Sequence, residues 1–169
     1  AILDAADREV GGMFADLPDD EAQVREAIGH GYSELGDSRP AEAQFKRILE
    51  IREAAGAPLR DRVLLRIQLA QICAEYPTNR FDDALKYLDA GTIDAVRASG
   101  DKVLLAMTLR TIGNIRLKTD EAAAVPILEE ARQVMVGVDD PGGVADGIES
   151  SLASYYLGAG EFQKALESY

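Results

Sequence analysis

The stretch IGHGYSELGDSRPAEAQF, residues 28–45, decides the fold that we expect for this chain. Near its start the small residue Gly29 directly follows an apolar residue, and near its end Ala41 precedes the bulky Phe45 by four positions. Spacings of three and four residues place side chains on one face of a helix, where small residues let two helix axes come close. Gly36, with an Asp after it, is typical of a tight turn. The stretch therefore predicts two helices that form a hairpin.

The same pattern occurs four times along the chain. Each copy has an apolar residue followed by a small one, then an Ala, then a bulky apolar residue four positions beyond that Ala. The copies begin at Ile28, Ile72, Ile112 and Leu152, their Ala residues are Ala41, Ala84, Ala124 and Ala165, and their bulky residues are Phe45, Leu88, Leu128 and Tyr169. The Ala residues recur every 40 to 43 positions, which is typical of proteins built from stacked repeats.

Turn-forming residues divide the chain into helices and repeats. The predicted helices span residues 2–16, 20–35, 39–55, 59–76, 81–98, 102–118, 121–136, 142–158 and 161–169. A single hairpin cannot bury its apolar face but stacked hairpins can, so we expect one all-α domain over residues 1–169, a right-handed α-solenoid. Its parts are a capping helix at 1–18 and four repeats, at about 20–56, 59–99, 102–138 and 142–169.

The first predicted helix lies outside the repeats. Its acids fall on one face, and its apolar residues form a stripe on the other: Leu3, Ala6, Val10, Met13, Phe14 and Leu17. We expect this helix to cover the first hairpin and to turn its charge outward; a helix that binds a partner or a membrane is the alternative. Because the chain starts at Ala1 without an initiator Met and the last helix is cut at Tyr169, we expect a piece of a longer protein.

Charge and composition exclude several classes of function. The net charge is −12 and the sequence has no basic stripe, so nucleic acids and anionic membranes are poor partners. No apolar run is long enough to span a bilayer, and we expect a cytoplasmic protein. A single cysteine, Cys73, and a single histidine, His30, exclude a disulfide within the chain and zinc sites of the Cys and His type. We expect neither a cofactor nor a metal.

Catalytic motifs are missing from the sequence. It contains no Gly-rich phosphate loop, nucleophile elbow or EF-hand loop. Acid pairs such as Asp19–Asp20 stand at predicted helix starts, where capping and the helix dipole explain them. Cys73 occupies a small-residue packing position, which favours a buried, unreactive thiol. We therefore expect a binding protein and not an enzyme.

Two of the four copies resemble the tetratricopeptide repeat consensus in residue type and spacing. They are the copy with Gly29, Tyr32, Gly36, Ala41 and Phe45, and the copy with Leu152, Ala153, Tyr156, Gly160, Ala165 and Tyr169. Because the period is longer than usual, the chain is most similar to the repeat regions of bacterial transcriptional activators, peptide-sensing regulators and protein kinases. The resemblance implies a scaffold that binds proteins or peptides in a bacterial signalling or transcription-regulatory protein. A small-molecule sensor, and a module that forms homo-oligomers through the truncated last helix, are the alternatives.

The resemblance also implies a groove, since the first helix of each hairpin lines the inner face in that family. The residues expected on it are Glu26 and His30, Ala70 and Ala74, Arg110 and Asn114, and Ser150 and Ser154. Arg110 has a fork suited to a carboxylate, Asn114 can bind a peptide backbone, and Met107 and Leu117 can form an apolar floor. We expect an acidic segment or C-terminus as ligand. The alternatives are an ion pair between Arg110 and a nearby acid, and an ordinary exposed His30.

Overall fold

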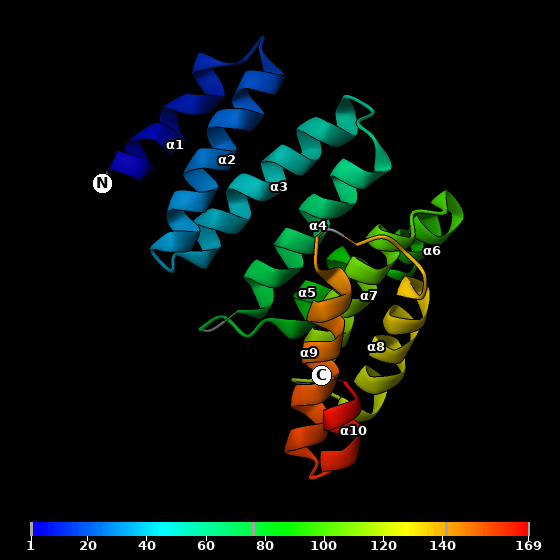
Figure 1. The fold of residues 1–169 in the computed structure, drawn as a ribbon. Helices are drawn as coiled ribbons and strands as arrows, with labels where there is room; N and C mark the ends of the chain where they lie inside the picture. Colours follow the sequence, from blue (N-terminus) through cyan, green and yellow to red (C-terminus); the bar gives the residue numbers. More distant parts are fainter. Residues whose placement is uncertain (1, 76, 141, 169) are drawn as a thin grey trace. The chain divides into compact units, whose positions relative to one another are not determined.

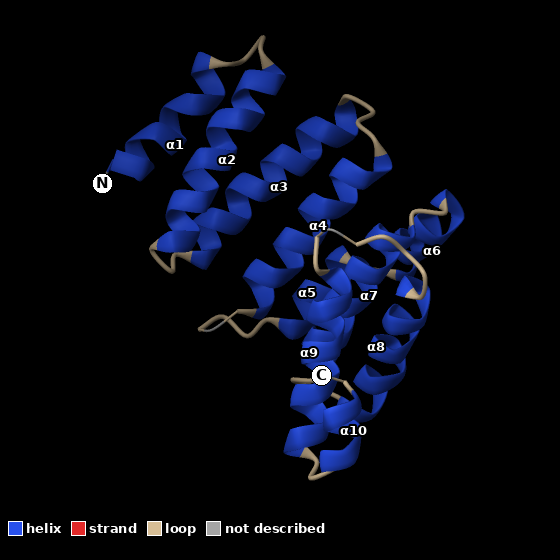
Figure 2. Cartoon of the chain, in the orientation of Figure 1, coloured by secondary structure: helices blue, strands red, loops and turns tan. Residues whose placement is uncertain are grey.

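The structure, a computed structural model, describes residues 2–75, 77–140 and 142–168. Within these ranges the secondary structure is helical and no strand is present (Figure 2). In the order of Figure 1, the helices are α1 (Ile2–Met13), α2 (Pro18–Glu34), α3 (Ser38–Ala54), α4 (Leu59–Ala74), α5 (Phe81–Tyr87), α6 (Ala90–Ser99), α7 (Lys102–Arg116), α8 (Glu121–Met135), α9 (Val144–Gly158) and α10 (Phe162–Glu167). The all-α class predicted from the repeats is confirmed.

One predicted helix is wrong. Residues 81–98 form two helices, α5 and α6, with a break at Leu88 and Asp89. The backbone of Asp89 is extended, and its side chain accepts a 2.8 Å hydrogen bond from the backbone N–H of Thr92, so Asp89 caps the start of a new helix. The other predicted helices are present within a few residues of their expected bounds. The helix ends predicted at Tyr76 and Tyr169 lie outside the described residues.

Removing the Asp89 cap is expected to weaken the start of α6. Replacing Asp89 by Ala leaves the backbone N–H of Thr92 without this partner and should lower the free energy of unfolding by about 1 kcal/mol. Asp94 is an exposed acid within α6, and Asp94→Ala removes the same charge without touching the cap, so its effect should stay below about 0.5 kcal/mol. Urea denaturation followed by circular dichroism measures both variants. Equal effects would rule out the capping role.

The helices pack into two compact units, residues 1–87 and residues 88–169. The boundary falls at the break between α5 and α6, inside the second predicted repeat. Within each unit, helices that follow one another in the chain pack side by side, α1 to α5 in the first unit and α6 to α10 in the second. Each unit is therefore a series of helical hairpins.

Small residues allow close packing in both units. A Cβ on Gly29 of α2 would lie 2.9 Å from the Phe45 ring of α3, and a Cβ on Gly113 of α7 would lie 2.6 Å from Leu128 of α8. Phe45 and Leu128 are fully buried. In these two hairpins the bulky residue of the second helix thus lies directly on the small residue of the first, as the sequence pattern predicts.

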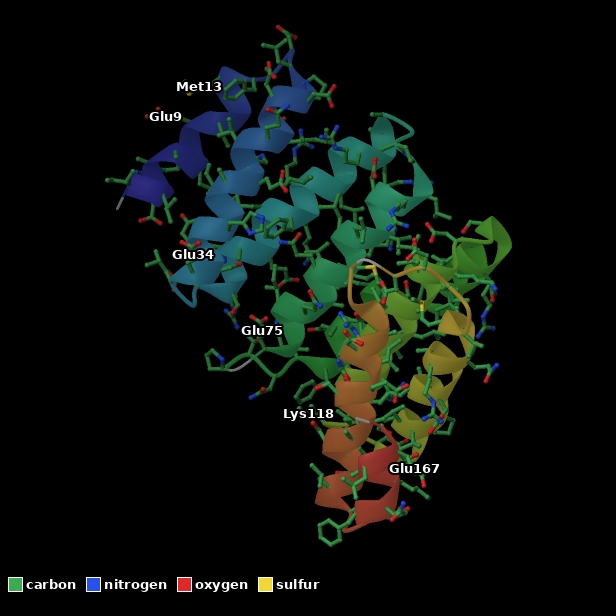
Figure 3. All side chains as sticks on the ribbon, in the orientation of Figure 1. Glu9, Met13, Glu34, Glu75, Lys118 and Glu167 are labelled. Carbon is green, nitrogen blue, oxygen red and sulfur yellow. The ribbon has the colours of Figure 1, made fainter. Side chains whose placement is uncertain are left out.

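The apolar stripe of α1 packs only in part against its neighbours. Four of its members lie on or in the core of the first unit: Leu3, Ala6, Val10 and Phe14. Met13, the last residue of α1, is exposed (Figure 3), and so is Leu17, which lies beyond the end of that helix. The predicted stripe is therefore correct at Leu3, Ala6, Val10 and Phe14 and wrong at Met13 and Leu17.

Two acids of α1 accept hydrogen bonds from α2 and α3, although Asp4 and Glu9 are exposed, so the charge of α1 faces outward only in part. The hydroxyl of Tyr32 donates a 2.8 Å hydrogen bond to Asp4, and Nε2 of Gln44 donates a 2.6 Å hydrogen bond to Asp7. Gln44 is buried, so Asp7 satisfies an amide group that water cannot easily reach. Burial and the Asp4 carboxylate together raise the pKa of Tyr32 to about 12. Polar contacts as well as apolar ones therefore hold α1 on α2 and α3.

Candidate binding surfaces

The residues predicted to line one groove are divided between the two units. Four of them belong to the first unit, Glu26, His30, Ala70 and Ala74, and six belong to the second: Met107, Arg110, Asn114, Leu117, Ser150 and Ser154. The structure offers candidate surfaces in each unit, and these are described separately.

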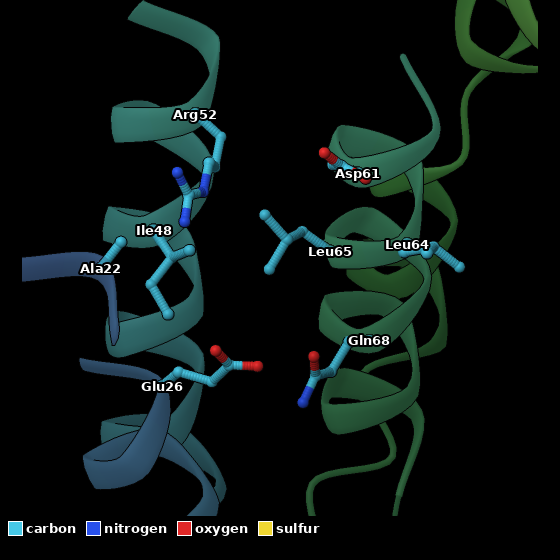
Figure 4. A pocket seen from close by; sticks show the side chains of 8 residues that line it. All are labelled: Ala22, Glu26, Ile48, Arg52, Asp61, Leu64, Leu65 and Gln68. Atoms are coloured by element: carbon cyan, nitrogen blue, oxygen red, sulfur yellow. The ribbon is translucent and has the colours of Figure 1, made fainter. Parts of the chain in front are cut away.

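The first unit has an open groove between α2, α3 and α4, with a volume of about 420 Å³. Figure 4 shows the side chains that line it, which are Ala22, Glu26, Ile48, Arg52, Asp61, Leu64, Leu65 and Gln68. We call this hollow the α2–α4 groove. Of the residues predicted from the sequence, Glu26 lines it.

The α2–α4 groove is apolar in its middle and polar at both ends. In Figure 4, Leu65 extends from α4 toward Ile48 on α3, while Glu26 and Gln68 face each other at one end. Arg52 and Asp61 lie at the other end. Ile48 is 4% exposed and belongs to the core, so the apolar part of the groove is an opening onto the core of this unit.

Some polar side chains of the groove already have a hydrogen-bond or ion-pair partner within the chain, and others do not. Arg52 donates a 2.6 Å hydrogen bond to Asp19, which neutralises it. Asp61 and Gln68 make no hydrogen bond or ion pair to any described residue. The contact that Glu26 makes is with Nε2 of His30, at 3.9 Å, and it is an ion pair only when His30 is protonated. The groove therefore presents two carboxylates and an amide that are available to a ligand.

Part of this groove was missed by the sequence analysis. The register expected Ala70 and Ala74 of α4 to face the ligand, but Ala70 is completely buried. The groove is lined instead by Asp61, Leu65 and Gln68, whose spacings of four and three place them on one face of α4. That row was visible in the sequence, but nothing in the sequence indicated which face of α4 would stay uncovered.

His30 lies one turn beyond Glu26 on α2. Its side chain is 55% exposed, and its ring meets the Phe45 ring edge-on, with 5.3 Å between the ring centroids. This contact gives His30 a packing role in addition to its place near the groove.

In the second unit, Arg110 of α7 reaches α9 at Gly147. Its Nη1 lies 1.9 Å from the position that a Cβ on Gly147 would occupy, so the guanidinium rests on the backbone of α9 where no side chain intervenes. Arg110 is half-buried and makes no hydrogen bond or ion pair to any residue that the structure describes. The alternative that Arg110 is held by a nearby acid therefore finds no such acid in the described part of the chain.

A hollow of about 290 Å³ lies between α9, the turn that follows α7 and the start of α8. It is lined by Leu117, Lys118, Glu121, Ser154, Tyr155, Gly158 and Ala159. Leu117 follows Arg110 by seven residues, and Ser154 follows Gly147 by seven residues, so the hollow lies about two helical turns beyond the Arg110–Gly147 contact. Asn114 is exposed on α7 between these two levels. Four of the predicted residues therefore lie along the contact between α7 and α9 or in the hollow at its end: Arg110, Asn114, Leu117 and Ser154.

The two other predicted residues of the second unit lie elsewhere. Met107 is half-buried and packs against the apolar core, as does Leu117. Ser150 lines a different hollow, beside Asp146, Glu149 and Ser168. The structure therefore does not bring Ser150 into the hollow that holds Ser154.

A buried polar cluster in the first unit surrounds Glu42 of α3. Glu42 accepts hydrogen bonds from Arg80, Tyr87 and Lys46, with distances of 2.8 Å for the last two. Arg80 also donates a 3.3 Å hydrogen bond to the sulfur of Cys73, which is fully buried. Burial, with a smaller effect of the Glu42 carboxylate, raises the pKa of Cys73 to about 11. The predicted buried thiol is confirmed, and it stays protonated near neutral pH.

Neither a metal cluster nor a membrane-spanning helix is found in the described part of the chain. No group of three or more His, Cys, Asp or Glu residues there could hold a metal ion. None of the helices in those ranges has the length and apolar character that a bilayer crossing requires.

Comparison with known proteins gives a likeness in fold. No family model matches the chain, and no curated protein matches it. A solved structure, that of BtubC (BKLC) from P. vanneervenii, is similar to 89% of this chain with a TM-score of 0.70 and 17% sequence identity. This chain spans 61% of the length of that protein. At such an identity the match bears on the fold alone, and it agrees with an all-α arrangement of packed helices.

Proposed function

We propose that this chain is a protein- or peptide-binding scaffold, and that it forms the regulatory or interaction region of a bacterial signalling or transcription-regulatory protein. Its helical hairpins, and the resemblance of two of them to tetratricopeptide repeats, support a binding role over a catalytic one. A cytoplasmic location is part of the same proposal. The observation that carries it is Arg110, a half-buried guanidinium that no described acid neutralises.

The proposed ligand is an acidic segment or a C-terminal carboxylate. A guanidinium binds a carboxylate through two parallel hydrogen bonds, and Gly147 lets the Arg110 side chain rest on α9 instead of extending into water. One turn further along α7, Asn114 is exposed and has both a donor and an acceptor for a peptide backbone. Leu117 then offers apolar contact in the neighbouring hollow. The three residues would bind a carboxylate, a backbone and an apolar side chain in succession.

Replacing Arg110 tests this proposal. Peptides with free C-termini are first selected from a displayed random library on the wild-type chain. Because hydrogen bonds to a charged group contribute about 1.5–3 kcal/mol, Arg110→Ala should weaken the selected peptides at least about tenfold. Arg110→Lys, which keeps the charge but loses the fork, should recover only part of that affinity. Fluorescence anisotropy with labelled peptides gives the dissociation constants.

Lys102 provides the matched control. It is an exposed cation at the start of α7, and Lys102→Ala removes one positive charge from the same helix away from the proposed contact. Its effect on affinity should stay below about twofold. A library that yields no acidic sequences, or affinities that Arg110→Ala leaves unchanged, would exclude this surface as the site.

A further inference from the structure

The α2–α4 groove is a second candidate binding site, and it presents carboxylates where the Arg110 surface presents a cation. We propose that it binds an extended protein segment in which a bulky apolar side chain lies next to a Lys or Arg. This inference goes beyond the proposed function, because it assigns a separate site and a different ligand chemistry to residues that the Arg110 surface does not use. The two sites can therefore fail or succeed independently.

The apolar middle of the groove accounts for the bulky side chain. Leu65 is half-buried and extends toward Ile48, which is 4% exposed, and the small Ala22 leaves room beside them (Figure 4). An apolar group placed between these side chains would remove their remaining surface from water, which favours binding. Since the groove opens onto the core, a bound side chain would extend that core outward.

The charge of the groove accounts for the cation. Its lining includes two carboxylates, Glu26 and Asp61, and one guanidinium, Arg52, which Asp19 already neutralises at 2.6 Å. Neither carboxylate forms an ion pair with a Lys or Arg among the described residues. Asp61 makes no ion pair there, and the contact of Glu26 is with His30. A segment with an acid would be repelled here, whereas a Lys or Arg would supply the missing partner.

The spacing of the polar groups fits an extended chain. Asp61 and Gln68 are separated by seven residues of α4, which correspond to about 10 Å along the helix axis. An extended peptide covers that length with about three residues. An apolar side chain in the middle of the groove would thus have a neighbour within reach of a carboxylate at either end. The amide of Gln68 can both donate to and accept from the backbone of such a segment.

A displayed random library also tests this inference, with the selected peptides compared between variants of the full chain. Wild type should enrich sequences that combine a bulky apolar residue with Lys or Arg. In Glu26→Gln/Asp61→Asn, which keeps the shape of both side chains, that enrichment should disappear, and peptides selected on wild type should bind about threefold to tenfold more weakly. Raising the salt concentration should reduce the difference, because exposed charges are screened.

The controls separate this site from the Arg110 surface. Glu9 and Asp16 are exposed acids of the first unit outside the groove, and Glu9→Gln/Asp16→Asn removes the same charge. This control and Arg110→Ala should both keep the basic, apolar preference. A wild-type library without Lys or Arg enrichment, or enrichment that persists in Glu26→Gln/Asp61→Asn, would overturn the proposal whatever the result for acidic peptides.

Discussion

Replacing Glu42 by Ala is expected to lower the free energy of unfolding by about 3 kcal/mol, the lower end of the range for removing one partner of a buried charge pair, because the partner Arg80 is only half-buried. Glu42 is 6% exposed and accepts hydrogen bonds from Arg80, Lys46 and Tyr87. Nε of Arg80 is buried and has no hydrogen-bond partner among the described residues. Without Glu42, the half-buried Arg80 side chain would lose its carboxylate partner.

The same residue is expected to make the protein sensitive to acid. Burial alone would raise the pKa of Glu42, but the hydrogen bonds from Arg80, Lys46 and Tyr87 outweigh it and lower the pKa to about 2. Its ordinary value is 4.5, so the folded protein holds the proton less tightly than the unfolded chain does. The resulting stabilisation, about 3 kcal/mol, is complete above pH 4.5 and is lost as the pH falls toward 2.

Urea denaturation of wild type and Glu42→Ala over a series of pH values measures both effects. Other carboxylates also lose their partners in acid, so both proteins should be destabilised, but the difference between them should shrink as the pH falls from 4.5 toward 2. Glu50 is the control on the same helix: it is exposed and pairs with Arg47 at 3.3 Å, and Glu50→Ala should cost less than about 1 kcal/mol. A difference that does not change with pH would mean that Glu42 is not the acid-sensitive group.

The sequence predicted the hairpins because packing of small residues on bulky ones leaves a periodic trace. Gly29 with Phe45, and Gly113 with Leu128, are contacts that follow from spacing alone. The break at Asp89 was missed because the spacing of apolar residues continues across it. Leu88, before the break, and Val96, after it, are both buried. The backbone at this point is set by a local hydrogen bond from the N–H of residue 92 to the Asp89 side chain. In the sequence, only the Asp itself, a residue type that often caps helices, indicated it.

The polar part of the candidate sites was harder to predict than the packing. Asp4 and Asp7 of α1 accept hydrogen bonds from Tyr32 and Gln44, which lie on other helices, and the spacing of residues within α1 does not indicate these partners. Whether Arg110 has an acidic partner likewise depends on side chains distant in the sequence. Periodicity indicates the buried face of a clearly amphipathic helix, but it does not show which charged side chains pair with one another. The sequence therefore named Arg110 and Glu26 without showing that each lacks a permanent partner.

Replacing Leu128 by Ala is expected to be among the most destabilising single changes in the second unit. Leu128 is completely buried in the core formed with α7 and α9 residues. Removing a buried Leu side chain costs about 3 kcal/mol, through lost apolar contacts and the cavity that remains. Gly113→Ala is expected to destabilise less, by about 1 kcal/mol, because its new Cβ would meet Leu128 at 2.6 Å while Ala favours the helix.

The two replacements should compensate each other when combined. In Gly113→Ala/Leu128→Ala, the cavity left at position 128 receives the new methyl group, so the double variant should be more stable than the sum of the single effects by about 1 kcal/mol or more. Gly158 is the control, because nothing lies within 4 Å of a Cβ placed there. Gly158→Ala should be neutral or slightly stabilising alone, and additive with Leu128→Ala. Urea denaturation of the single and double variants gives the coupling energies. Additive effects of the 113 and 128 replacements would mean that the close approach of α7 and α8 does not depend on this small–large pair.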